Sequence, residues 1–245
     1  MATRDQPLLF NNADIHSVLR AQDEQVARSV NSYDAEQLLA QAEHDIVAYL
    51  VEKELLDPPV LDLAGRFSQK GLEEIQMQVR DDWFDGQSVA VPAQRMVLTI
   101  PFSGDEGFFQ IQPSTYTLSP PRATVNGASV ELVFVDRTLP TEKLRALIDG
   151  EAEQLERYLA RLRSDVAPFN AKLPVVVERL VKERKAALLE SRNVEADLGI
   201  PVRARQGPGT FSIPSRPRRV EVKPPPATGP FNPEPALTQE HYEET

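Results

Sequence analysis

Hydrophobic positions recur at helical spacing over residues 34–56. There Leu38, Ala42, Ile46 and Leu50 repeat every four residues, which predicts a helix that Asp34 or Ser32 caps. The run Asp57-Pro58-Pro59 ends this helix, because proline offers no N–H group and restricts the residue before it. Residues 1–31 show only a weak pattern and predict a flexible arm. Residues 60–80 are compatible with a helix or with irregular structure.

The spacing changes after residue 89, where short runs rich in β-branched and aromatic residues predict strands. Asn126-Gly127 separates two such runs and predicts a hairpin, since both residues tolerate the positive φ of a type I′ turn. A small antiparallel sheet of about four strands is therefore expected over residues 89–136. In its last run both alternating faces are apolar, so we expect that strand to be covered on both sides. The predicted strand runs are MVLTIPF (96–102), FFQIQP (108–113) and SVELVFV (129–135).

Helical spacing returns after residue 140 and predicts two long helices, over residues 140–166 and 170–193. Pro168-Phe169-Asn170 stands between them and predicts an αα-hairpin. The first of these helices carries an apolar seam, defined by Leu144, Ile148, Leu155, Leu159 and Leu162. The fold class is therefore α+β: a small antiparallel sheet flanked by helices, a long C-terminal αα-hairpin and a disordered Pro-rich tail. Residues 32–202 are expected to form one domain.

Residues 203–245 are rich in proline, arginine and glycine and predict an extended linker, because this composition buries too little apolar surface to offset the entropy of ordering it. The chain has 21 prolines and no cysteine, which excludes disulfides and thiolate chemistry. No apolar stretch is long enough to span a bilayer, and no leader is evident, so a cytoplasmic protein without membrane contact is expected. The run around Thr238 reads as a helix start and predicts a further domain downstream.

Candidate chemistry is sparse. The three histidines, His16, His44 and His241, lie in separate segments without metal-ligand spacing, and no phosphate-binding glycine loop occurs. We therefore expect no catalytic residue, no metal site and no cofactor. The densest acidic cluster contains Asp81, Asp82 and Asp85, which could hold a divalent cation in a carboxylate enzyme. A solvated turn anchored by its aromatic neighbours is the simpler interpretation.

Two surfaces are candidates for binding. The apolar seam predicts either packing against the sheet or contact with a protein partner or a second copy. A basic run on the next predicted helix could contact nucleic acid, although the chain has a net charge of −10 and its first 137 residues are strongly acidic. Nucleic-acid binding is therefore the weaker alternative. The basic run is Arg179, Lys182, Arg184, Lys185 and Arg192.

Part of the sequence resembles a bacterial family. The matching runs are VLTIPFSGDEGFFQIQPSTYTLSPPRATVNGASVELVFV, PFNAKLPVVVERLVKERKAALLESR, LGIPVRAR and EPALTQEHYEET, at about residues 90–205 and 233–245. They resemble the N-terminal half of proteins that carry a restriction-endonuclease-like or Toll/interleukin-receptor-like effector domain, for which a role in phage defence is proposed. No carboxylate-x-Lys core of such a nuclease follows a predicted strand in these 245 residues. The resemblance therefore implies a non-catalytic sensing or protein-interaction module tethered to an effector.

Overall fold

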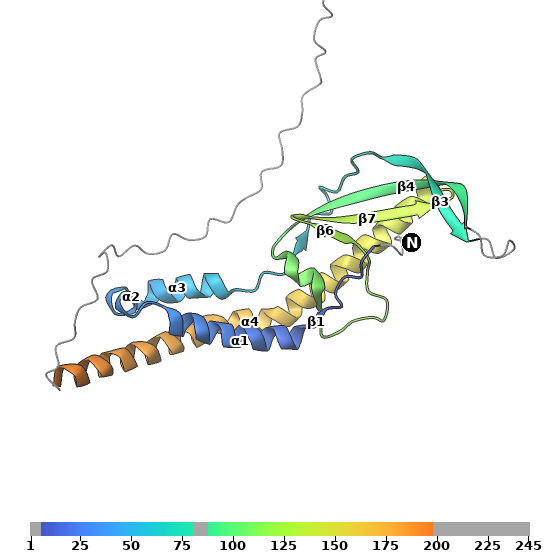
Figure 1. Cartoon of the computed structure of the whole chain (residues 1–245). Coiled ribbons are helices and arrows are strands. Elements are labelled where there is room, and N and C mark those ends of the chain that lie inside the picture. Colours follow the sequence, from blue (N-terminus) through green and yellow to red (C-terminus); the bar gives the residue numbers. More distant parts are fainter. Residues whose placement is uncertain (1–5, 81–87, 198–245) are drawn as a thin grey trace, which may run out of the picture. The chain divides into compact units, whose positions relative to one another are not determined.

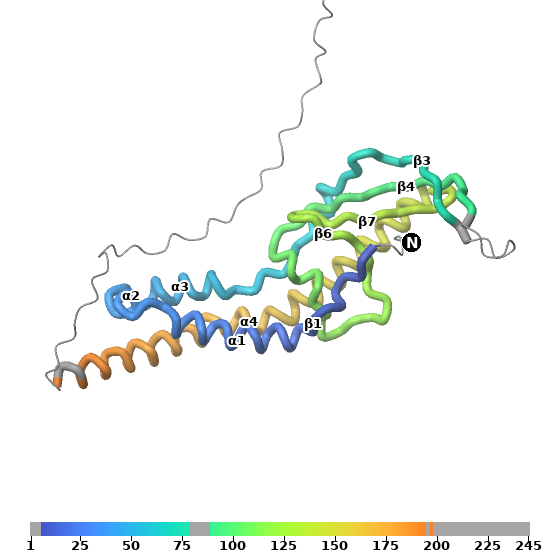
Figure 2. The backbone as a smooth tube through the Cα atoms, viewed as in Figure 1, coloured from blue at the N-terminus to red at the C-terminus, as the bar shows by residue number. Residues whose placement is uncertain are grey.

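The computed structural model describes residues 6–80 and 88–197, and these form a mixed α+β fold, which confirms the predicted class. Figures 1 and 2 show helices α1, α2 and α3 beside one half of α4, and the sheet beside its other half. The helices are α1 (Ile15–Ser32), α2 (Ala35–Ala40), α3 (Glu43–Glu54), the 3-10 helix η1 (Glu106–Gln110) and α4 (Thr141–Asp197). The strands are β1 (Ala13–Asp14), β2 (Val60–Leu61), β3 (Leu72–Arg80), β4 (Ser88–Ser103), β5 (Ile111–Gln112), β6 (Thr124–Asn126) and β7 (Ser129–Asp136).

Helix α4 is continuous through both prolines, so the predicted αα-hairpin is wrong: the segments 140–166 and 170–193 form one helix. Each of Pro168 and Pro174 removes a helical hydrogen bond and costs about 3 kcal/mol in a helix interior. Buried apolar residues flank the prolines on the same helix, with Val166 before Pro168 and Val177 after Pro174. Their burial contributes about 1.5–3 kcal/mol per side chain, which offsets this cost. A hairpin would remove either Val166 or Val177 from the elements against which it packs.

The two halves of α4 belong to two separate cores. The first half packs against the sheet through Ala152, Leu155, Tyr158, Leu159 and Leu162. The second half packs against α1, α2 and α3. The second core consists of Val26, Val30, Leu38, Ile46, Leu50, Leu173, Val177 and Val181. The helix therefore connects a helix-on-sheet layer to a helical bundle.

Strand β4 is the centre of the sheet. One edge pairs antiparallel with β7, from Gln94↔Asp136 to Pro101↔Ser129. The other edge pairs antiparallel with β3, from Leu72↔Met96 to Arg80↔Ser88, and with the short β2. Because β7 ends opposite Gln94, residues 88–93 of β4 pair with β3 alone. Strands β3 and β4 thus continue as a two-stranded ribbon beyond β7.

The segment 6–32 is ordered, which corrects the flexible arm expected for residues 1–31. Leu9, Phe10 and Ile15 are buried in the first core, and the Asp14 carboxylate caps α1 by accepting a 2.9 Å hydrogen bond from the Ser17 N–H. The apolar residues of α1 are few and stand among polar ones, and its amphipathic pattern was therefore missed. The Gln6 side chain accepts a hydrogen bond from the Val133 N–H and donates one to the Glu131 carbonyl, which extends pairing along β7.

The helix predicted over residues 34–56 is two helices, α2 and α3. Gln41 ends α2 with an extended backbone (ψ 158°), and Ala42 precedes α3 with ψ 132°. The Tyr33 hydroxyl contacts the Gln41 side-chain oxygen at 3.0 Å, which holds this break in place. Because neither residue is glycine or proline, the sequence carried no signal for the interruption.

Two further segments differ from expectation. Residues 60–80, predicted as helix or irregular, form β2 and β3, so the sheet begins well before residue 89. The run FFQIQP forms η1 and then the two-residue β5. Phe108 and Phe109 are both buried in the first core. Adjacent residues of a strand point to opposite faces, so a strand would direct only one of the two rings into this core, whereas a 3-10 turn lets both reach it. Asp105 caps that turn through the Gly107 N–H.

The predicted hairpin is present between β6 and β7, with its turn shifted by one residue. Asn126 pairs with Ser129, so the turn residues are Gly127 and Ala128. Gly127 has φ +56°, and Ala128 is not among the described residues with positive φ. Glycine at the first position is typical of a type II′ turn rather than the predicted type I′.

Candidate functional site

The apolar seam of α4 is occupied by the protein's own sheet. Leu155, Leu159 and Leu162 are fully buried in the first core, and Leu144 and Ile148 are half-buried against it. The use of this seam as a partner or homodimer surface is therefore wrong, and the packing alternative holds. The spacing of the seam is compatible with packing inside the protein and with an interface, and the sequence alone does not distinguish these two uses.

Most of the basic run on α4 is bound within the chain. Arg184 donates to the Val30 carbonyl, Arg192 pairs with Glu36, and Lys182 pairs with Glu178 and, at 3.6 Å, with Glu43. The hydrogen bond that the Lys182 ammonium donates to the Glu178 carboxylate is the main reason that the pKa of Lys182 is raised above its usual value of 10.5, with the charge of Glu178 adding to it. Arg179 is exposed and Lys185 is half-buried. This face therefore offers a weakened field to a phosphate backbone.

The carboxylates Asp81, Asp82 and Asp85 lie outside the described residues. Among residues 6–80 and 88–197, no group of three or more histidine, aspartate or glutamate side chains is arranged to hold a metal ion. His44 lies 3.6 Å from the Asp45 carboxylate with a side chain that is 93% exposed, in line with a surface histidine, and His16 is also exposed.

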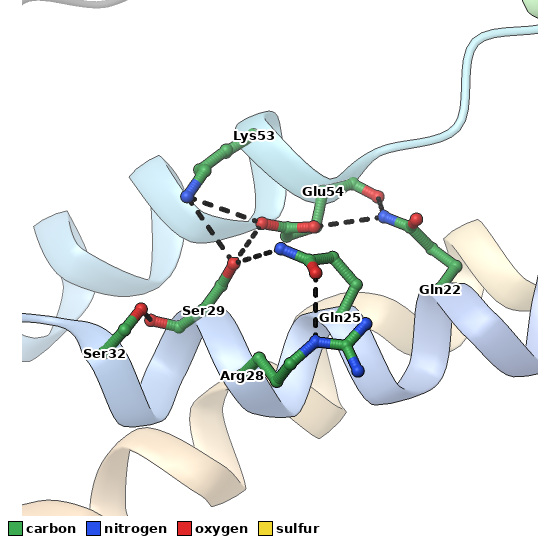
Figure 3. A network of polar contacts seen from close by, with 7 residues as sticks. All are labelled: Gln22, Gln25, Arg28, Ser29, Ser32, Lys53 and Glu54. Atoms are coloured by element: carbon green, nitrogen blue, oxygen red, sulfur yellow. Dashed lines mark hydrogen bonds and ion pairs between the residues drawn. The ribbon is translucent and has the colours of Figure 1, made fainter.

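A buried glutamate lies at the centre of a polar network between α1 and α3 (Figure 3). Glu54 is only 4% exposed, and its Oε1 accepts a 2.6 Å hydrogen bond from the Ser29 hydroxyl. Gln22 donates to Oε2 at 3.1 Å and to the Glu54 backbone carbonyl at 3.0 Å. The Lys53 ammonium lies 3.7 Å from Oε1. Sequence analysis missed this residue, since a glutamate near a helix end gives no signal of burial.

The arrangement around Glu54 is that of a structural contact. Both carboxylate oxygens have donors from the chain itself, and a buried carboxylate that is satisfied in this way costs little to keep. Ser29 in turn accepts from Gln25 at 3.2 Å, so the network ties several side chains of α1 to one residue of α3. We infer that it fixes how α1 packs against α3.

An apolar groove of about 260 Å³ lies between α1 and α4, beside Pro168. Its lining combines apolar residues, such as Leu19 and Phe169, with charged ones, such as Asp23 and Lys172. No convergent set of polar groups within the described chain marks it as a site for a particular ligand.

The outer face of the sheet, defined as the face opposite α4, is the strongest candidate. In β7, Val130, Leu132 and Phe134 point into the core, so the alternating Val133 and Val135 lie on the outer face. The register places Val97 opposite Val133 on this same face. Along the ribbon, the outer face continues through Ile75, Met77, Val89 and Val91.

These outer-face residues are only partly covered. Val133, Val135 and Val97 are half-buried, and Val89 is 45% exposed. Both faces of β7 are apolar, as predicted. The prediction that the strand is covered on both sides is wrong within the described chain, because only the inner face of β7 is fully buried. Residues 68–71 lie beside part of the outer face and leave a hollow of about 180 Å³ next to Thr99 and Glu131. Apolar side chains that a sheet leaves partly exposed in this way are candidates for contacts with other proteins.

Comparison with known proteins gives no family for the chain: no protein-family model, no curated protein and no solved structure matches it significantly. Within the described residues, no helix is both long and apolar enough to cross a membrane.

Proposed function

We propose that this chain is a non-catalytic sensing or protein-interaction module of a bacterial defence system, and that the outer face of its sheet binds a protein partner. The partner is a nuclease-type effector domain, tethered through the Pro-rich segment after residue 202. The observation that supports this most is that Val97, Val133 and Val135 are only half-buried on the outer face, whereas Val130, Leu132 and Phe134 of β7 are fully buried on the opposite face.

The chemistry of this face favours a protein over a nucleic acid. Valine side chains gain from burial at about 25 cal/mol per Å² of apolar area, and they offer no donors to phosphate. The charged residues beside them have both signs, with Glu73, Arg95 and Glu131 on the outer face and Lys70 paired with Glu73 at 3.4 Å. An apolar centre with a mixed polar rim is the usual composition of a protein–protein interface.

The test is association between the 245-residue chain and the polypeptides encoded in frame with it or beside it. Val133→Lys together with Val135→Lys places two charges on the outer face, and we expect it to weaken binding at least 100-fold in a titration by calorimetry. This corresponds to about 1–2 kcal/mol for each buried charge.

Val175→Lys is the matched control, because Val175 is 69% exposed on α4, away from the sheet. It should bind like the wild type. Circular dichroism spectra and unfolding curves of all variants establish that each is folded. Equal binding by the double variant and the control would overturn the proposed use of this face.

A further inference from the structure

We propose that the hollow on the outer face of the sheet binds a small α-amino acid, with its carboxylate on Arg95 and its ammonium group on Glu131. The hollow has a volume of about 180 Å³, and it is lined by the segment 68–71 and by residues of β3, β4 and β7. This inference goes beyond the proposed function, because the ligand binds the chain alone, whether or not an effector is present.

The hollow exists because the strand pairing beside β4 is interrupted. Phe67 pairs with Thr99 through two backbone hydrogen bonds of 3.0 and 2.8 Å, and the pairing resumes at Leu72↔Met96. From Phe67 to Leu72 the chain takes five steps, against three from Met96 to Thr99. The two additional residues make the segment 68–71 bulge away from the ladder, as in other β-bulges.

The bulged segment is held in position by its own contacts. The Gly71 N–H donates a 3.1 Å hydrogen bond to the Ser68 hydroxyl, and Gly71 has φ +69°, a left-handed conformation that favours glycine. The Lys70 ammonium lies 3.4 Å from the Glu73 carboxylate, which ties the segment to β3. The hollow is therefore pre-formed, as small-molecule sites usually are.

The register places two charged residues at opposite ends of the hollow. Glu131 of β7 stands opposite Thr99 of β4, and both line the hollow at one end. Arg95 lies four residues from Thr99 along β4, on the same face, and Val97 lies midway between them. At about 3.3–3.4 Å per residue, the Cα atoms of Arg95 and Thr99 lie about 13 Å apart. The side chains of Arg95 and Glu131 can therefore reach both ends of a small molecule that lies over Val97.

Three polar side chains of the hollow have no partner within the part of the chain that the structure describes. Arg95 and Glu131 are half-buried, and neither side chain takes part in a hydrogen bond or ion pair there. Thr99 is only 6% exposed, and its hydroxyl also has no hydrogen-bond partner among the described residues. Buried polar groups in proteins are nearly always paired, so these three groups point to a bound ligand.

The charges and the size of the hollow together specify a zwitterion. Arg95 and Lys70 balance Glu73 and Glu131, so a ligand with a net charge would leave one charge of the site uncompensated. A guanidinium pairs with a carboxylate through two parallel hydrogen bonds, and a glutamate accepts from an ammonium group. At about 30 Å³ per water molecule, the volume corresponds to about six waters, which is the size of a small amino acid. Val97 offers an apolar contact to an aliphatic side chain.

Titration of the 245-residue chain with L-valine, followed by ligand-observed NMR, tests the proposal. Two fragments of the same shape serve as comparisons: isovalerate, which lacks the amino group, and isobutylamine, which lacks the carboxylate. Each fragment should bind at least about tenfold more weakly than L-valine, because each leaves one charged side chain of the hollow without its partner.

Substitution of each charged residue should remove the preference for one end of the ligand. Arg95→Gln and Glu131→Gln should each weaken L-valine binding about tenfold or more. Arg95→Gln should then bind L-valine and isobutylamine about equally, and Glu131→Gln should do the same for L-valine and isovalerate. Arg137→Gln and Glu74→Gln are the matched controls, since Arg137 is exposed beyond the end of β7 and Glu74 is exposed on the other face of β3. Both should bind like the wild type.

Thr99→Val separates a role in binding from a role in folding. It should weaken L-valine binding about threefold or more without lowering Tm, because the hydroxyl that it removes has no partner in the free chain. Absence of binding by L-valine, L-alanine and L-serine would overturn the proposal, and so would binding that both Arg95→Gln and Glu131→Gln leave unchanged. These titrations use the chain alone, whereas the effector contact is measured with a partner polypeptide, so failure of one is distinguishable from failure of the other.

Discussion

Substitution of Ser29 by alanine should destabilise the fold through a residue in a segment that the sequence predicts to be a flexible arm. The Ser29 hydroxyl donates the shortest hydrogen bond to the Glu54 carboxylate, at 2.6 Å, and Glu54 is buried. Without it, Oε1 keeps only the Lys53 ammonium at 3.7 Å. Hydrogen bonds to charged groups contribute about 1.5–3 kcal/mol, so we expect Ser29→Ala to lower the free energy of unfolding by about that amount.

Urea unfolding followed by circular dichroism measures this loss. In a domain of this size, each kcal/mol shifts Tm by about 2–4 °C, so a decrease of about 3–12 °C should accompany it. Ser32→Ala is the matched control, because the exposed Ser32 donates only to the Ser29 backbone carbonyl at 3.2 Å and should cost less than about 0.5 kcal/mol.

A double-mutant cycle assigns the loss to the Glu54 contact. In a Glu54→Leu background no buried carboxylate is left to satisfy, so Ser29→Ala should cost at least about 1 kcal/mol less there than in the wild type. Equal costs in both backgrounds, or a loss no greater than that of Ser32→Ala, would refute the reasoning.

Two further predictions concern α4 and its first residues. Pro168→Ala should raise the free energy of unfolding by about 1–3 kcal/mol in urea titration, because it restores an N–H group to a continuous helix. The unfolded chain becomes more flexible without the proline, which lowers this gain by up to about 1 kcal/mol. A loss of stability would show that the packing of the proline ring contributes more than the restored hydrogen bond. The hydrogen bond from Lys143, at 2.6 Å, is the main cause that holds the pKa of Asp136 below its ordinary value of 3.8, and the Arg137 N–H adds to it. The contribution of the ionised Asp136 to stability is therefore fully present above pH 3.8 and is lost as the pH falls through the lower pKa of the folded state. Asp136→Asn should therefore reduce the fall in the free energy of unfolding at acid pH. A fall equal to that of the wild type would contradict this.

The sheet and the helical content follow from local patterns. The alternation in β7 and the Asn126-Gly127 signal act over a few residues, so both were visible in the sequence. The continuity of α4 was not, because Pro168 costs energy locally and the compensating burial of Val166 and Leu173 comes from elements far away in the chain. Similarly, α1 has apolar residues at helical spacing, Ile15, Leu19, Val26 and Val30, but they are few, and the elements that bury them lie elsewhere in the chain.

The candidate sites show the same limit. The seam through Leu155 and Leu159 has the spacing of an interface, and only the position of the sheet shows that it is core. The outer face depends on register between strands, which the sequence leaves open.

The most direct test of the proposed function is a footprint on the complex between this chain and its genetically adjacent polypeptide, by hydrogen–deuterium exchange. Binding through the outer face should slow exchange in β4 and β7 around residues 97 and 131–135, with no change over residues 179–192 of α4. Slower exchange over residues 179–192, with the sheet unaffected, would contradict the central claim that the outer face of the sheet binds the partner.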